Sequence, residues 1–70
     1  MKRRDVLKKL REAARKRGLA YRESELTRHS EIRVGETSRT LGQHAEVDDL
    51  TARKFWDQFA EELGGKGWWR

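Results

Sequence analysis

The chain has 70 residues and no cysteine, so it can build one hydrophobic core but neither a disulfide framework nor thiolate chemistry. Its net charge is +5, and no apolar run approaches the roughly 20 residues that a membrane span needs. Met1 is followed by charged residues rather than by the apolar core of a signal peptide, so we expect a cytoplasmic protein without membrane contact.

A first helix is predicted over the opening residues. Its apolar positions recur at the spacing of one buried helical stripe, namely Val6, Leu7, Leu10, Ala13 and Ala14. Gly18 stands where a left-handed C-terminal cap belongs, because glycine adopts a positive φ without steric cost. We therefore expect this helix to end just before Gly18.

The same segment carries the excess positive charge. Residues 1–18 hold nine lysines and arginines against two acidic residues, a charge of +7, whereas residues 19–70 sum to −2. A basic stripe on one element is typical of a surface that binds nucleic acid or an acidic partner. It makes Lys8, Lys9 and Arg11 candidate phosphate-binding residues. The alternative is that these charges only solvate a helix face.

From Leu19 onward apolar and polar residues alternate along the chain, which predicts strands. The expected order is a strand over 19–23, a polar connection over 24–27, a half-buried strand over 29–34 and a returning strand over 37–41. Gly35-Glu36 between the last two has the composition of a two-residue hairpin turn, with the positive φ at glycine. The chain order is thus helix, three antiparallel strands and helix.

The turn position fixes which residues face each other across the hairpin. A turn at Gly35-Glu36 pairs His29 with Gly42 at the far end of the two strands. His44 then falls just past the strand end, beside His29. The same register turns Arg39 toward the core, unless its side chain snorkels to the edge or the pairing slips.

After a loop from residue 42, Asp48 or Asp49 can cap a second helix. Its apolar residues recur at helical spacing: Ala52, Phe55, Trp56, Phe59, Ala60 and Leu63. Gly64-Gly65 ends this helix, which leaves residues 1–64 as a single domain and residues 65–70 as a flexible tail. Within the tail, Trp68-Trp69 can fold back over an incomplete core or anchor a partner.

Three stretches resemble the HicA-type toxins, which are small mRNA interferases of bacterial toxin–antitoxin pairs. MKRRDVLKKL (residues 1–10) resembles their first helix, HSEIRVG (29–35) the strand that begins at their functional histidine, and LGQHAEV followed by LTAR (41–53) their loop into the second helix. The family usually has Gly-Ser before that histidine, where this chain has Thr27-Arg28, and proline around its loop histidine, where this chain has none.

The resemblance implies an α+β fold like that of a double-stranded-RNA-binding domain, α-β-β-β-α, with two helices packed on one face of a three-stranded antiparallel sheet. It also implies RNA cleavage without metal or cofactor, and a HicB-like antitoxin protein as partner. Such cleavage uses the ribose 2′-OH as nucleophile and needs a base, an acid and positive charge near the phosphate. His29 is the candidate base, His44 a weaker candidate acid, and Arg28 and Arg33 the candidates for positive charge.

Two other functions stay open from the sequence. The first is a non-catalytic module with the same fold that binds RNA or a protein through the basic first helix. The second is a relative kept only for folding or partner binding. A domain this small without a disulfide is marginally stable, and association with a partner or with its own copy as a homo-oligomer would stabilise it.

Overall fold

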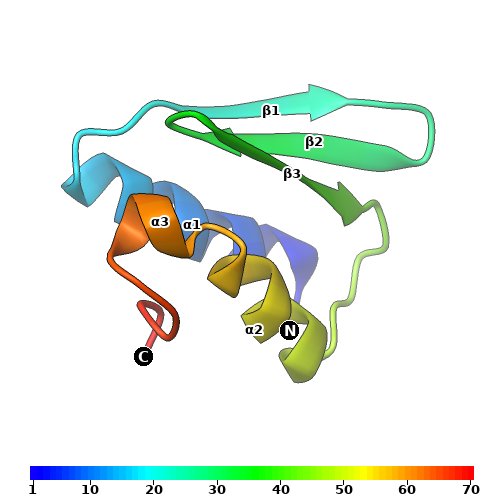
Figure 1. Cartoon of the computed structure of the whole chain (residues 1–70). Coiled ribbons are helices and arrows are strands. Elements are labelled where there is room, and N and C mark those ends of the chain that lie inside the picture. The colour runs from blue at the N-terminus through cyan, green and yellow to red at the C-terminus, as the bar shows by residue number, and fades with distance from the viewer.

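The computed structural model describes residues 1–70 and has the expected order of elements. They are α1 (Arg3–Lys16), β1 (Tyr21–Glu25), β2 (His29–Val34), β3 (Thr37–Gly42), α2 (Asp49–Asp57) and α3 (Ala60–Leu63). The strands form one antiparallel sheet with β2 in the middle, and the helices lie on one side of it (Figure 1). The predicted α+β fold, α-β-β-β-α, is therefore confirmed. No helix combines the length and the hydropathy that crossing a bilayer requires.

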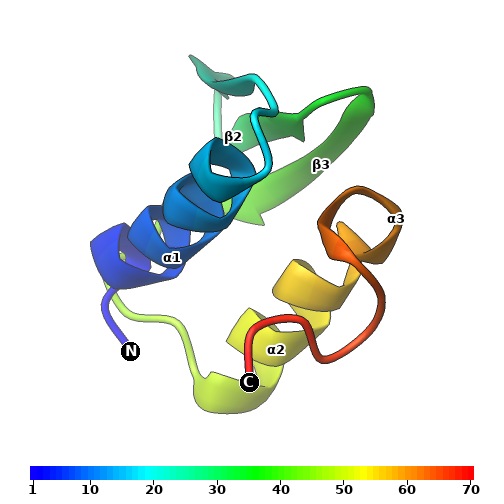
Figure 2. The same ribbon diagram turned by 90° about the vertical axis from the view of Figure 1, so that its left-hand side faces the viewer.

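Helix α1 forms as its sequence pattern predicts. It buries Val6, Leu7, Leu10 and Ala14 toward the sheet and the other helices, where each large side chain contributes about 1.5–3 kcal/mol. Gly18 ends the segment with φ = 68°, and its N–H donates to the carbonyl oxygen of Arg15. Figure 2 shows α1 on one side and the α2–α3 pair on the other, both beneath the sheet.

The β2–β3 hairpin has the predicted register, with Val34 opposite Thr37 and His29 opposite Gly42. Gly35 has φ = 58° and no residue other than glycine has a positive φ, which matches a type II′ turn. Arg39 lies opposite Ile32, as this register requires. Its guanidinium reaches the sheet edge, where Nη1 donates to the carbonyl oxygen of Ser38 at 2.7 Å. The pairing therefore does not slip.

The first strand extends further than the sequence pattern predicts. It pairs with β2 from Tyr21 as far as Glu25, which lies opposite Ser30. The predicted end near residue 23 is wrong, because polar residues continue the ladder where their side chains find partners across the strands. Glu25 is such a case: its carboxylate lies beside the side chains of Ser30 and Gln43.

The second helical segment is two helices rather than the single helix predicted. Asp48 caps α2, and its side chain accepts from the Thr51 N–H at 3.2 Å. The helical run breaks at Phe59, whose backbone has φ = −103° and ψ = 19° while its ring is fully buried against Phe55, 5.3 Å away between centroids. The break redirects α3, so that Glu62 accepts hydrogen bonds from the β2–β3 turn.

The C-terminal segment runs back along α2, although its glycines predict a flexible tail over 65–70. The Trp68 indole donates to the carbonyl oxygen of Trp56 at 2.7 Å, and the Trp69 indole donates to the Asp57 carboxylate at 2.9 Å. Both indoles pack against the core. Of the two alternatives for Trp68-Trp69, the structure shows the one in which they fold back.

Candidate active site at the His29 end of the sheet

His29 begins β2 and faces away from the helices. Along this strand buried and exposed residues alternate, and His29 is exposed. Its register partner, Gly42, has no side chain, which leaves space beside His29 on the outer face. The ring of His44 lies next to that space, because its Cδ2 atom is 3.6 Å from where a Cβ of Gly42 would stand. The two histidines thus lie at the same end of the sheet, as the register predicts, and no hydrogen bond joins them.

His44 also faces the start of α2. It lines a hollow of about 190 Å³ between the end of β3 and the helix, together with Gly42, Asp48 and Thr51. The hydroxyl and the backbone N–H of Thr51 both donate hydrogen bonds to the Asp48 carboxylate. These bonds keep the pKa of Asp48 below its ordinary value. His44 therefore shares this hollow with the Asp48 carboxylate, which already accepts hydrogen bonds from Thr51.

The backbone around His29 is fixed by Gln43. The carbonyl oxygen of His29 accepts from the Leu26 N–H at 2.8 Å and from the Gln43 side-chain amide at 3.0 Å. The same Gln43 nitrogen is 3.2 Å from the carbonyl oxygen of Leu26 and 2.7 Å from the Glu25 carboxylate. These contacts close the loop that carries Arg28 onto the end of β3. Sequence reasoning did not find Gln43, because its partners come from another strand and its connecting loop.

Arg3 supports the inner side of the same strand end. Its Nη2 donates to the Ser30 hydroxyl at 2.6 Å and its Nε donates to the carbonyl oxygen of Gly42 at 2.8 Å. Ser30 is fully buried, as its inward register predicts, and its hydroxyl lies 3.5 Å from the Glu25 carboxylate. One guanidinium thus joins α1 to both strands directly beneath His29, a role that only the packing of the helix on the sheet reveals.

The two arginines predicted to assist His29 lie in different places. Arg28 is exposed in the loop immediately before it. Arg33 shares the outer face of β2 but stands four residues further along, which at about 3.3 Å per residue is roughly 13 Å away. There its Nε donates to the carbonyl oxygen of Gly35 and it lines a separate hollow with Arg22. Arg28 therefore adjoins His29 along the chain, whereas Arg33 does not lie at this end of the sheet.

The basic residues of α1 are divided between two surfaces. Lys8 and Arg11 line a hollow of about 460 Å³ between α1 and β1, together with Arg3 and Arg4 and the carboxylates of Asp5 and Glu23. Lys9 faces the other way, with its Nζ 5.5 Å from the ring centroid of Trp56. None of these cations forms a salt bridge, since the ion pairs in the structure involve only the N-terminal ammonium group.

Two further observations limit the chemistry. Burial and a hydrogen bond to Glu23 raise the pKa of Tyr21 above its ordinary value, so this hydroxyl does not supply protons near neutral pH. No group of three or more His, Asp or Glu side chains gathers where it could hold a metal ion. His29 and His44 are the two histidines of the chain, and imidazole is the side chain that enzymes use most often as a general acid or base.

Comparisons of the chain with protein-family models, with curated proteins and with solved structures give no match.

Proposed function

We propose that the protein is a toxin-type endoribonuclease of the kind its sequence resembles, one that cleaves mRNA without a metal and uses His29 as general base. The position of His29 is the observation that carries the proposal. Its imidazole is exposed, while the peptide that bears it is held from both sides by Gln43 and Leu26. A general base needs access to the substrate, and the backbone contacts fix the position of the strand end that carries it.

The proposed reaction is an internal transfer within the RNA. His29 takes the proton of a ribose 2′-OH, and that oxygen attacks the adjacent phosphorus. The bond to the 5′-oxygen of the next nucleotide breaks, and this oxygen takes a proton from an acid, for which His44 is the candidate. The products are a 2′,3′-cyclic phosphate and a 5′-hydroxyl. Arg28, in the loop before His29, would stabilise the charge that develops on the phosphate.

The surface between α1 and β1 supports RNA as the substrate. Arg4, Lys8 and Arg11 follow one another at helical spacing along it, and none of them is paired with a carboxylate. Arg3 lines the same hollow and reaches Ser30, next to His29. An RNA backbone held by these cations on the helix side would pass the edge strand β1 to reach His29 on the outer face. Under the same proposal, a HicB-like antitoxin in the cytoplasm would inhibit the enzyme by covering His29.

One observation favours a second function, a non-catalytic RNA-binding module. The basic row along α1 (Arg4, Lys8 and Arg11) is complete, whereas Arg33 lies far from His29 and no hydrogen bond orients the His29 imidazole. Binding of RNA phosphates would require only these basic residues of α1. Such a module would bind RNA with a strong dependence on salt and leave it intact.

Cleavage of a labelled RNA in the presence of EDTA tests the proposal. We expect His29→Ala to lower the cleavage rate by about 10²–10⁴-fold, the usual contribution of a general base, and to relieve growth arrest on expression. Ser24→Ala, an exposed change on β1, is the matched control and should cleave like the wild type. Equal cleavage by a folded His29→Ala protein would refute the catalytic role. RNA binding without cleavage by the wild type would support the module.

A further inference from the structure

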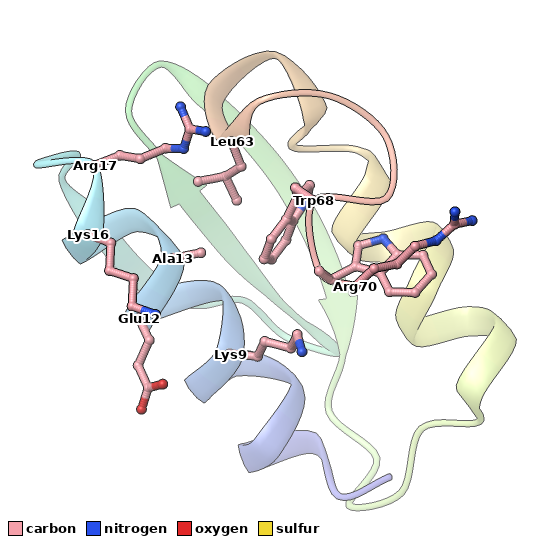
Figure 3. A pocket seen from close by; sticks show the side chains of 9 residues that line it. Lys9, Glu12, Ala13, Lys16, Arg17, Leu63, Trp68 and Arg70 are labelled. Carbon is pink, nitrogen blue, oxygen red and sulfur yellow. The ribbon is translucent and has the colours of Figure 1, made fainter.

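Another hollow lies on the helix side of the molecule, across the sheet from the exposed face that carries His29. It has a volume of about 350 Å³ and is formed by α1, α3 and the C-terminal segment (Figure 3). Ala13, Leu63 and Trp68 supply its apolar lining. This volume is within the range of small-ligand sites in proteins. The hollow can therefore hold a group about the size of a nucleotide.

The charge around this hollow is strongly positive. Four cations line it, namely Lys9, Lys16, Arg17 and Arg70, against the single carboxylate of Glu12. None of the four forms a salt bridge, and Figure 3 shows the Glu12 carboxylate pointing away from Trp68. The C-terminal end of α1 carries a partial charge of only about −0.5. The cations outweigh it, so the hollow attracts anions.

Trp68 gives the hollow a fixed aromatic surface. Its indole nitrogen donates to the carbonyl oxygen of Trp56 at 2.7 Å, and the two rings pack edge to face with centroids 6.2 Å apart. Figure 3 shows the Trp68 ring between Arg17 at one end of the hollow and Lys9 at the other. An aromatic ring held in place between cations is the arrangement on which proteins stack the bases of single-stranded nucleic acid.

We propose that this hollow binds a segment of single-stranded RNA, with a base against Trp68 and the flanking phosphates at Arg17 and Lys9. The site is separate from His29, so it can bind RNA whether or not the protein cleaves it. It also accounts for the direction of Lys9, which points away from the basic row of Arg4, Lys8 and Arg11. Helix α1 then offers phosphate contacts on two of its faces.

The test uses a labelled 2′-O-methyl oligoadenylate of about six nucleotides, which lacks the nucleophilic hydroxyl and cannot be cleaved. Fluorescence anisotropy at several salt concentrations gives the Kd of the wild type and of the double variant Lys9→Gln/Arg17→Gln. We expect the double variant to raise the Kd at least about tenfold and to lower the salt slope by about 1.4, the value for two phosphate contacts. Trp68→Leu should also raise the Kd about tenfold through lost stacking.

The matched control is Lys2→Gln/Lys54→Gln, which removes the same charge from exposed positions outside the hollow. Each variant is checked for folding by its thermal unfolding curve. Equal affinity in wild type and Lys9→Gln/Arg17→Gln would overturn the proposal, and so would an equal loss in the control. Binding of a polyglutamate peptide that Lys9→Gln/Arg17→Gln weakens, with no effect of that variant on the oligonucleotide, would assign the hollow to an acidic protein instead. His29→Ala should bind the probe normally, which separates this site from the proposed catalysis.

Discussion

Arg3, in the first turn of α1, donates a 2.6 Å hydrogen bond to the fully buried hydroxyl of Ser30, the residue that follows His29. This contact spans 27 positions in the sequence. It fixes the helix against the centre of the sheet at the point where the candidate base stands. The two partners differ in exposure, because Ser30 is fully buried whereas Arg3 is only partly so.

This difference predicts unequal effects of the two single substitutions. Arg3→Met leaves a buried hydroxyl with only the 3.5 Å contact to Glu25 and should lower the free energy of unfolding by about 1–3 kcal/mol. Ser30→Ala removes the buried hydroxyl itself and leaves a guanidinium that water can reach, so its effect should be smaller. Urea unfolding measures both values. A larger loss in Ser30→Ala than in Arg3→Met would contradict this account of the contact.

Gln43 is expected to act on His29 through the backbone. Gln43→Ala removes one donor from the His29 carbonyl oxygen and should increase amide hydrogen exchange in the loop at residues 26–28. If His29 is the general base, the cleavage rate should fall as well. Gln58→Ala is the matched control, since Gln58 is exposed and its side chain makes no hydrogen bond. Unchanged exchange in the loop of the Gln43→Ala protein would argue against this positioning role.

Docking of the C-terminal segment is expected to depend on pH through Asp57. Hydrogen bonds from the Gly67 N–H and the Trp69 indole lower the pKa of this carboxylate. Because the pKa is lowered in the folded state, the stabilisation is complete above the ordinary aspartate pKa of about 3.9 and is lost as the pH falls through the lowered value. Tryptophan fluorescence should therefore change in an acid step below about pH 4.

Two variants isolate the origin of that acid step. Asp57→Asn has no carboxylate to protonate and should lack the step, whereas Asp48→Asn removes a different aspartate of lowered pKa, the cap of α2, and should keep it. The fluorescence of Trp68 and Trp69 reports the docking directly, because both indoles contact Trp56. A full acid step in the Asp57→Asn protein would show that another group controls the segment.

Two glycines of positive φ should respond differently to alanine. Gly35→Ala and Gly18→Ala each force a positive φ on alanine, which an L side chain adopts only with strain. At Gly18 the new Cβ meets nothing within 4 Å, whereas at Gly35 it would stand 2.5 Å from the Glu62 carboxylate. That carboxylate must move and lose its hydrogen bonds to the hairpin. Thermal unfolding should show the larger loss at Gly35, and equal losses would contradict the packing argument.

The sequence alone determined the local elements of this protein. The buried stripe of α1, its end at Gly18, the turn at Gly35 and an aspartate cap at Asp48 or Asp49 were predicted, and the turn fixed the register that opposes His29 to Gly42. Each of these features depends on residues a few positions apart, whose periodicity and backbone preferences can be read along the chain.

Tertiary structure decided how those elements meet. It broke the second helix at Phe59, laid the C-terminal segment along α2 and set Arg3 beneath His29. These outcomes depend on contacts between residues far apart in the chain, which form only when the helices pack on the sheet. The spacing of residues along the chain does not contain that geometry, because the same amphipathic pattern fits many ways of packing a helix against a sheet.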